Sequence, residues 1–271
     1  MTELPALLQS VRDRYVARRV QVQGLVWALR DTRPGTGEPP LVMLPGALGT
    51  GDVFYKMLAA LGSEHRLVAL SYPALESAQT LAHSLNELFE AMSWPQLDLL
   101  GTSLGGYVAQ AAALARGDRI RRLVLSSTFF DADLQKKRWP SAESYRSLDV
   151  EAITATAREQ LQAGPEPTPE HAELKQLMLV LVGSEQTGPA IRAMRLAVLT
   201  ASPLPRVPID ESRITLIDDD DDPVIAEPTR LQMRQRYSSS LHIRIPGGGH
   251  FPANLCSGAY EAALRRILQA S

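Results

Sequence analysis

A serine between glycines is the strongest chemical signal in the sequence. Residues 101–105, Gly-Thr-Ser-Leu-Gly, have the G-x-S-x-G pattern and join an apolar run at 97–100 to a helical pattern at 104–116. In this pattern a nucleophilic serine sits on a strained strand-to-helix turn, and its neighbours must be small to avoid clashes. The alternative is a glycine-rich turn with a bystander serine. Because the segment lies between a strand and a helix, we predict that Ser103 is a nucleophile.

A serine hydroxyl needs a base to remove its proton, and His250 is the best placed of the five histidines. It follows three glycines, 247–249, after a predicted strand at 241–245. Open α/β sheets place ligands at the carboxyl ends of their strands, so we predict that His250 is the base. The alternative is a structural or exposed loop histidine. The other four are expected at the surface, in packing contacts or on a sheet face: His65, His83, His171 and His242.

An acidic residue to orient the histidine is expected from the run of five aspartates at 218–222, which follows a predicted strand at 214–217. The chain order serine, aspartate, histidine is that of α/β-hydrolases. Five adjacent like charges repel, so the alternative is a solvated acidic turn or an adventitious cation site. One aspartate buried against His250 with the others exposed would satisfy both interpretations.

An acyl-transfer enzyme also needs backbone N–H groups that bind the oxyanion. The residue after the nucleophile, Leu104, is the first expected donor, and Ala47 in the loop 45–49 after a predicted strand is the second. A dinucleotide site is disfavoured because the glycines at 46, 49 and 51 do not have the G-x-G-x-x-G spacing. No cofactor and no metal are therefore expected.

Apolar runs alternate with helical patterns along most of the chain. The runs at 41–44, 67–70, 97–100, 123–126, 214–217 and 241–245 predict buried strands. This rhythm predicts an α/β fold, a mostly parallel twisted sheet with helices on both faces. The pattern is only helical between 131 and 208, with helices expected at 150–162, 171–182 and 189–199. We therefore predict a core formed by 1–130 and 209–271, with 131–208 as a helical cap insertion.

Composition restricts the partners. The 271 residues include 28 Lys and Arg and 30 Asp and Glu, a net charge of −2, so neither nucleic acid nor an anionic membrane is an expected partner. Cys256 is the only cysteine, which excludes an intrachain disulfide and a cysteine zinc site. Without an apolar run of ~18 residues or a signal-peptide pattern, we expect a soluble, cytoplasmic protein. The sequence does not indicate the oligomeric state.

From residue 41 to the C-terminal helix, these features resemble the α/β-hydrolase superfamily, and within it the maspardin-like branch. The resemblance is carried by blocks at 44–45, 49–54, 66–73, 103–107, 109–110 and 247–256. It implies that the acid stands a few residues beyond its strand, before a proline, which is Asp222; Asp221 is the alternative if the turn shifts by one residue. It also implies a non-histidine at the base position in the maspardin branch. This chain has His250 there, which favours an enzyme.

Two segments depart from the common hydrolase pattern. Pro45-Gly46 replaces the usual His-Gly, and 72–75 replaces an Asp-Arg-Gly-His-Gly-like stretch. Dehalogenase and epoxide hydrolase relatives use a carboxylate nucleophile, so Ser103 disfavours both chemistries.

The sequence therefore predicts a serine hydrolase that cleaves a small carboxylic ester or thioester through an acyl-enzyme, with a small-molecule acyl substrate. One alternative is a non-catalytic binding or scaffold protein on the same fold. The other is acyl transfer or C–C hydrolysis with the same triad. The substrate would be selected by the cap, which carries no recognisable motif.

Overall fold

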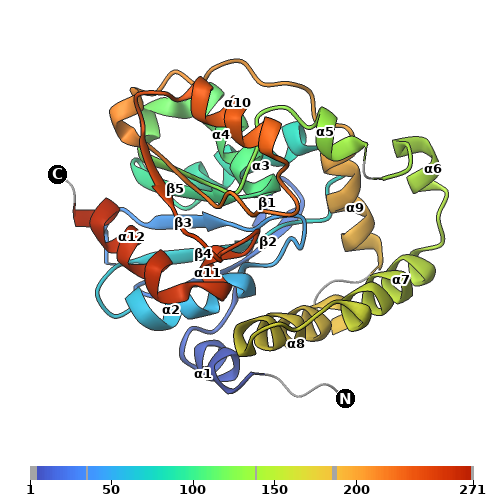
Figure 1. Cartoon of the computed structure of the whole chain (residues 1–271). Coiled ribbons are helices and arrows are strands. Elements are labelled where there is room, and N and C mark those ends of the chain that lie inside the picture. Colours follow the sequence, from blue (N-terminus) through green and yellow to red (C-terminus); the bar gives the residue numbers. More distant parts are fainter. Residues whose placement is uncertain (1–4, 35, 138, 185–187, 270–271) are drawn as a thin grey trace.

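The structure, a computed structural model, describes residues 5–34, 36–137, 139–184 and 188–269. Within these residues, eight strands form one sheet in the order β1-β2-β4-β3-β5-β6-β7-β8 (Figure 1). The strands are β1 Arg18–Val22, β2 Leu25–Asp31, β3 Leu41–Leu44, β4 Leu67–Ser71, β5 Leu97–Thr102, β6 Ile120–Ser126, β7 Ile214–Asp218 and β8 Leu241–Arg244.

Six of these strands, from β4 to β8 in the sheet order, are parallel, whereas β1 and β2 form an antiparallel hairpin at one edge. The register pairs Leu44 with Gly101 and Thr102 with Ser126, so β3, β5 and β6 end side by side. The loops that follow the parallel strands therefore meet at one edge of the sheet. The predicted α/β fold with a mostly parallel sheet is confirmed.

Helices cover both faces of the sheet because the strand side chains alternate between two hydrophobic clusters. In β3, Val42 and Leu44 join one cluster, while Leu41 and Met43 join the other. The first cluster includes α3 Ala78–Ala91, α4 Leu104–Arg116 and α10 Glu227–Arg236; the second includes α1 Ala6–Arg14, α2 Tyr55–Leu61, α11 Pro252–Leu255 and α12 Ser257–Gln269. Figure 1 shows these two groups above and below the sheet. Three short 3-10 helices complete this part: η1 Gly51–Phe54, η2 Gly117–Arg119 and η3 Glu211–Arg213.

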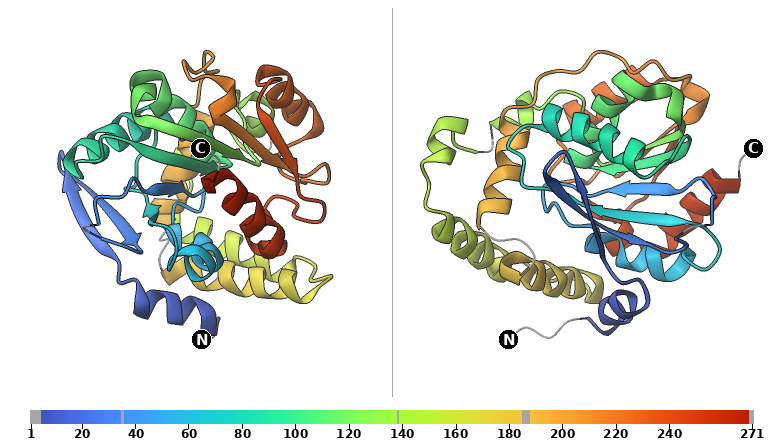
Figure 2. Two further views of the ribbon diagram at one scale, coloured as in Figure 1. Left: turned by 90° about the vertical axis from the view of Figure 1, so that its left-hand side faces the viewer. Right: turned by 180° about the vertical axis from the view of Figure 1, so that it is seen from behind.

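Residues 131–208, here called the cap segment, lie between β6 and β7 and contain five helices in their described part. They are α5 Asp133–Lys136, α6 Ala142–Arg146, α7 Val150–Ala163, α8 Pro169–Ser184 and α9 Gly188–Leu199. Figure 2 shows that the longer helices, α7, α8 and α9, lie beyond one end of the sheet. Leu177 and Leu181 of α8 pack into the cluster of α2 and α12, while Ala197 and Val198 of α9 pack into the cluster of α3 and α4. The cap segment is thus attached on both sides of the sheet.

The sequence patterns do not predict four of the helices: α1, α5, α6 and α11. In α1 only Leu8 and Val11 are buried, and the other three have four or five residues. Such segments are too short to show a helical period, and tertiary packing decides their conformation. Four strands are also longer than predicted: β4 and β7 each by one residue, β5 by extending to Thr102 and β6 by beginning at Ile120.

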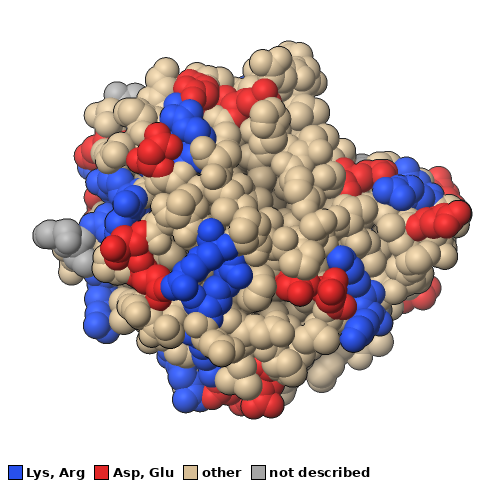
Figure 3. Space-filling model, turned by 90° about the horizontal axis from the view of Figure 1, so that it is seen from above, with Lys and Arg blue, Asp and Glu red and all other residues tan. Residues whose placement is uncertain are grey.

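On the face seen in Figure 3, basic and acidic side chains lie next to one another rather than in fields of one sign. In the part of the chain that the structure describes, no helix combines the length and apolar character needed to cross a membrane.

Candidate active site

Ser103 lies on a strained turn between β5 and α4. Its backbone has φ 51° and ψ −121°, a conformation that is costly for a residue with a side chain. Hydrogen bonds hold the turn: the Ser103 N–H donates to the carbonyl of Ser126 over 3.0 Å, and the Ser103 carbonyl accepts from the Thr128 hydroxyl over 2.6 Å. Strain that neighbouring contacts maintain in this way is typical of functional sites.

Three glycines allow this turn because other chain segments approach them closely. A Cβ at Gly101 would collide with the carbonyl of Gly105, and one at Gly105 would collide with the end of β3. A Cβ at Gly106 would strike the side chain of Thr128. The G-x-S-x-G pattern therefore serves packing: it lets α4 begin directly against β3 and the residues after β6.

His250 is oriented by Asp222. The His250 Nδ1 lies 3.0 Å from Asp222 Oδ2, and the other carboxylate oxygen accepts the N–H groups of Val224 and Ile225 over 2.7 and 2.9 Å. Burial raises the pKa of Asp222, but the hydrogen bond and charge of His250 together with the backbone N–H groups lower that pKa below its ordinary value. An ionised carboxylate can only accept, so Nδ1 carries the proton and a neutral His250 has a free lone pair on Nε2.

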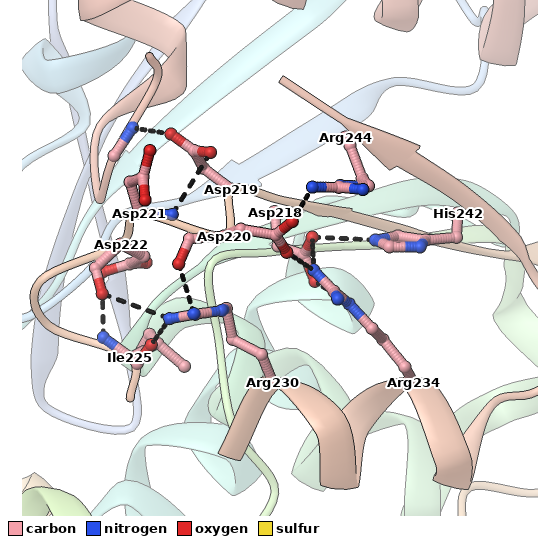
Figure 4. Close-up of polar contacts among 11 residues, drawn as sticks. Asp218, Asp219, Asp220, Asp221, Asp222, Ile225, Arg230, Arg234, His242 and Arg244 are labelled. Atoms are coloured by element: carbon pink, nitrogen blue, oxygen red, sulfur yellow. Dashed lines mark hydrogen bonds and ion pairs between the residues drawn. The ribbon is translucent and has the colours of Figure 1, made fainter. Parts of the chain in front are cut away.

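Asp218 and Asp220 pair with other side chains than His250, and they share Arg234 (Figure 4). Asp218 pairs with Arg234 of α10 over 2.7 Å and with His242 of β8 over 2.8 Å. Asp220 pairs with Arg234 over 2.8 Å and also with Arg244. These ion pairs offset the mutual repulsion of the run, which is why adjacent carboxylates can be accommodated here.

The interpretation in which one aspartate is buried and the others are exposed is wrong for Asp218 and Asp219. Both are buried, and Asp219 Oδ2 accepts the N–H of Gly249, the residue before His250, over 2.8 Å. Asp221 is the exposed member of the run. Partners from α10, β8 and the histidine loop decide these positions, and none of them adjoins the run in sequence.

The loop after β3 reaches Ser103. A Cβ at Gly46 would lie 3.1 Å from the Ser103 Cβ, so the backbone of this loop passes directly beside the serine. Ala47 follows in the loop, while the Leu104 N–H lies in the first turn of α4, where amides have no acceptor within the helix. The backbone of Gly46 and the start of α4 at Leu104 thus lie beside Ser103, and the role of the Ala47 and Leu104 N–H groups as oxyanion donors stays a prediction.

Tyr72 holds this loop at two points. Its hydroxyl donates to the carbonyl of Pro45 over 2.7 Å, and its N–H donates to the carbonyl of Gly49 over 2.8 Å. The ring of Trp27 packs edge-on against the Tyr72 ring with centroids 5.9 Å apart. The two departures from the common hydrolase pattern, Pro45 and Tyr72, are thus in contact. Sequence reasoning missed this contact because 27 residues separate the partners.

A cavity of about 450 Å³ joins these groups to the cap segment. Ser103, His250 and Ala47 line its inner side, and Asp222 lies behind His250. The cap segment supplies much of the outer wall, including Gln135, Trp139, Leu161, Met178, Ile191 and Arg195. Such a largely apolar cavity next to a candidate nucleophile suits a small organic substrate.

Some residues in the cavity wall were expected elsewhere. His171 of α8, predicted as a surface or packing residue, lines the cavity and contacts the Thr168 hydroxyl through Nδ1 at 2.9 Å. Met178, also of α8, lines the cavity as well. Helical spacing identifies the inner face of α8 but does not say whether a core or a cavity lies behind it. Among the described residues, no cluster of His, Cys, Asp and Glu could hold a metal ion.

Comparison with known proteins gives one family. A family model described as "alpha/beta hydrolase fold" matches residues 39–253. Human maspardin is 26% identical over 238 residues, which cover 86% of this chain and 76% of maspardin. The predicted resemblance to the hydrolase superfamily and its maspardin branch is confirmed.

Solved structures show the same fold at lower sequence identity. An esterase from Exiguobacterium antarcticum has a TM-score of 0.75 and 19% identity, covering 94% of this chain and 100% of the esterase. The enol-lactonase from Burkholderia xenovorans has a TM-score of 0.73 and 16% identity, covering 93% of this chain and 100% of the lactonase. At these identities the likeness concerns the fold.

Proposed function

The chain belongs to the α/β-hydrolase family, and from this premise we propose that it is a serine hydrolase that cleaves a small carboxylic ester or thioester through an acyl-enzyme. One observation carries the proposal: Ser103 on a strained turn borders the same cavity as His250, and His250 is hydrogen-bonded to the buried Asp222 behind it. A packing role for Ser103 alone would not require its strained backbone.

The proposed reaction has two halves, acylation of Ser103 and deacylation by water, and His250 acts first as base and then as acid in each half. Nε2 of His250 accepts the Ser103 proton as Oγ attacks the acyl carbon, and the N–H groups of Leu104 and Ala47 bind the developing oxyanion. His250 then gives the proton to the leaving alcohol or thiol. A water molecule, deprotonated by His250 in the same way, then attacks the acyl carbon; the bond from that carbon to Ser103 Oγ breaks, His250 returns the proton to Oγ, and the acid leaves. Asp222 stays ionised and stabilises the imidazolium.

The maspardin likeness supports a second candidate, a binding protein on the same fold. A third candidate, acyl transfer or C–C hydrolysis, would use the same triad and differ in the group that enters or leaves. Labelling by a fluorophosphonate separates the binding protein from the other two, because only an activated serine reacts stoichiometrically. We expect intact-mass and peptide analysis to place one label on Ser103. A folded protein without a label would favour the binding protein.

Steady-state kinetics on short-chain 4-nitrophenyl esters test the triad. We expect Ser103→Ala and His250→Ala each to lower turnover about 10⁴- to 10⁶-fold, and the double variant to be little worse, because groups that act as one unit are not additive. Asp222→Asn should lower turnover by roughly 10⁴, since Nδ1 would lose its carboxylate acceptor. The matched control, Asp221→Asn in the same run, should stay within about threefold because a substitution away from the site has little effect. Equal losses in both aspartate variants would contradict the assignment.

A further inference from the structure

His250 follows a loop of three glycines, residues 247–249, which carry no side chains that could pack against the core. Two of them have left-handed backbone conformations, with φ of 80° at Gly247 and 49° at Gly249. Glycine adopts this region without a steric cost, but it also loses more conformational freedom on folding than any other residue. The position of His250 therefore depends on contacts that other parts of the chain make with this loop.

Asp219 makes such a contact. Its Oδ2 accepts the N–H of Gly249, the residue before His250, over 2.8 Å. Another hydrogen bond of the loop is internal to it, since the N–H of Gly248 donates to the carbonyl of Ile245 over 3.1 Å. The bond to Asp219 instead joins the loop to the turn that follows β7.

The same turn also holds the ring of His250. Asp222 Oδ2 lies 3.0 Å from His250 Nδ1, and the N–H of Asp222 donates to the carbonyl of Asp219 over 3.3 Å. One turn thus contacts the backbone of the histidine loop through Asp219 and the imidazole through Asp222. Loss of the backbone contact would let the imidazole move relative to Ser103, and a displacement of about 1 Å can lower a rate about 100-fold.

Asp219 differs from the other aspartates of the run in its surroundings. It is 3% exposed, and it forms no ion pair with any residue that the structure describes, whereas Asp218 and Asp220 pair with Arg234. Figure 4 shows the side chain of Asp219 apart from Arg234. Its Oδ1 accepts the N–H of Asp221 over 3.4 Å, so Asp219 also shapes its own turn. Burial of an acidic group without a cation is unfavourable, and a role as acceptor for the loop N–H explains why an acidic side chain occupies this position.

We propose that Asp219 is a positioning residue, which fixes the glycine loop through the N–H of Gly249 and so keeps His250 in the orientation that a base for Ser103 needs. This inference rests on the proposed function and adds a residue to its site. Asp219 does not line the cavity, so it acts through His250 and not on the substrate. Its loss should therefore affect the rate of the reaction more than the binding of the substrate.

Kinetics on 4-nitrophenyl butyrate test the hydrogen bond. In Asp219→Ala we expect kcat to fall about 10- to 100-fold with KM within about twofold, because only the alignment of the base changes. Asp219→Asn keeps an amide oxygen that can accept the Gly249 N–H, so its kcat should stay within about fivefold of the wild type. Asp221→Ala, in the exposed neighbour, is the matched control and should stay within about threefold. An unchanged kcat in Asp219→Ala, or equal losses in the Ala and Asn variants, would overturn the proposal.

Amide hydrogen exchange followed by NMR tests the position of the loop without any reaction. We expect exchange at the Gly249 N–H to be at least about tenfold faster in Asp219→Ala than in the wild type, while exchange at Leu99 in β5 stays unchanged. The Nδ1 proton of His250 should also exchange faster with water. Equally faster exchange at all sites would show that Asp219 supports the whole fold, which would overturn the proposal. If Asp219→Ala does not fold, Asp219→Leu fills a similar volume without an acceptor and should give the same changes.

The two measurements separate failure of this inference from failure of the proposed function. If the wild type cleaves no ester but Gly249 and His250 still exchange faster in Asp219→Ala, the hydrolase proposal fails and the role of Asp219 in holding the loop stands. If the wild type cleaves esters through Ser103 and Asp219→Ala changes neither kcat nor the exchange, the positioning role fails and the hydrolase proposal stands.

Discussion

The hydroxyl of Tyr72 reaches the loop that we propose supplies one oxyanion donor. It donates to the carbonyl of Pro45, two residues before Ala47, and the Tyr72 ring packs against Trp27. An oxyanion hole is effective when its donors are already oriented before the reaction. At this position the chain has therefore replaced the usual loop sequence with a tyrosine that fixes the loop from the side.

Replacing Tyr72 by Phe tests this role, because the variant keeps the ring and the backbone N–H and loses only the hydroxyl. We expect kcat to fall about 10- to 100-fold with KM within about twofold, as for an interaction that matters mainly in the transition state. Affinity for a boronic acid that mimics the tetrahedral intermediate should fall in parallel. Tyr237→Phe removes a comparable buried hydrogen bond, 3.0 Å long to Gln110, and serves as the matched control. Similar kinetics in the two variants would argue against a role of Tyr72 in the oxyanion loop.

At the scale of elements, α8 is joined to the core by a small polar cluster. Glu173 of α8 accepts hydrogen bonds from the Tyr55 hydroxyl over 2.5 Å and from Lys56 Nζ over 2.7 Å. Lys56 also donates to the carbonyl of Asn254 in α11, which follows the His250 loop. Burial raises the pKa of Glu173, but Lys56 and Tyr55 lower it below its ordinary value, so the carboxylate is the form that the cluster holds. One cluster thus ties a cap helix to α2 and α11.

Glu173→Gln should loosen α8 without unfolding the sheet. Glu173 is 34% exposed, so the interaction is partly screened and we expect a loss of about 1 kcal/mol or less. Amide hydrogen exchange in α8 should then be about two- to fivefold faster, while exchange in α4 stays unchanged. Glu159→Gln on the exposed side of α7 is the control. Faster exchange throughout the chain would show that the cluster supports the whole fold rather than the position of α8.

At the scale of the whole molecule, two hydrophobic clusters fill the two faces of the sheet, and the ion pairs of the acidic run lie at the end of β7 and β8. Burial raises the pKa of Asp218, but hydrogen bonds and charges from His242 and Arg234 lower it below its ordinary value. A carboxyl with a lower pKa in the folded chain stabilises the fold above its unfolded pKa, ~3.9 for Asp. That contribution is lost as the pH falls through the folded value.

Asp218→Asn should therefore lower the free energy of unfolding by about 1–3 kcal/mol at pH 6, since it leaves the partly buried Arg234 and His242 less well paired. The difference from the wild type should shrink as the pH falls below ~4, where Asp218 of the wild type becomes protonated too. Urea denaturation between pH 3 and 6 measures this. Asp221→Asn should change the free energy by less than about 0.5 kcal/mol throughout, because Asp221 is exposed. If the loss of unfolding free energy in Asp218→Asn does not change with pH, the contribution of Asp218 comes from packing and not from its charge.

The sequence by itself predicts the alternation of the six parallel strands with most of the helices, and it predicts the candidate nucleophile and base. These depend on local patterns: apolar runs that end in turns, a strand-to-helix turn with small residues around Ser103, and a glycine loop before His250. Each of these patterns lies within about ten consecutive residues. The chain order of the three reacting groups then predicts which strand ends must come together, since parallel strands end at one edge of a sheet.

Only the tertiary structure decides the contacts between segments that are distant in the chain. The sequence leaves Asp222 and Asp221 open, because five identical side chains carry no local difference; the fold places Asp222 against His250 and Asp218 against Arg234. It also brings Tyr72 to Pro45 and sets Arg195 in the wall beside Ser103. In each case the deciding quantity is a distance across the fold, set by packing of the sheet, α10 and the cap segment, and no local pattern encodes it.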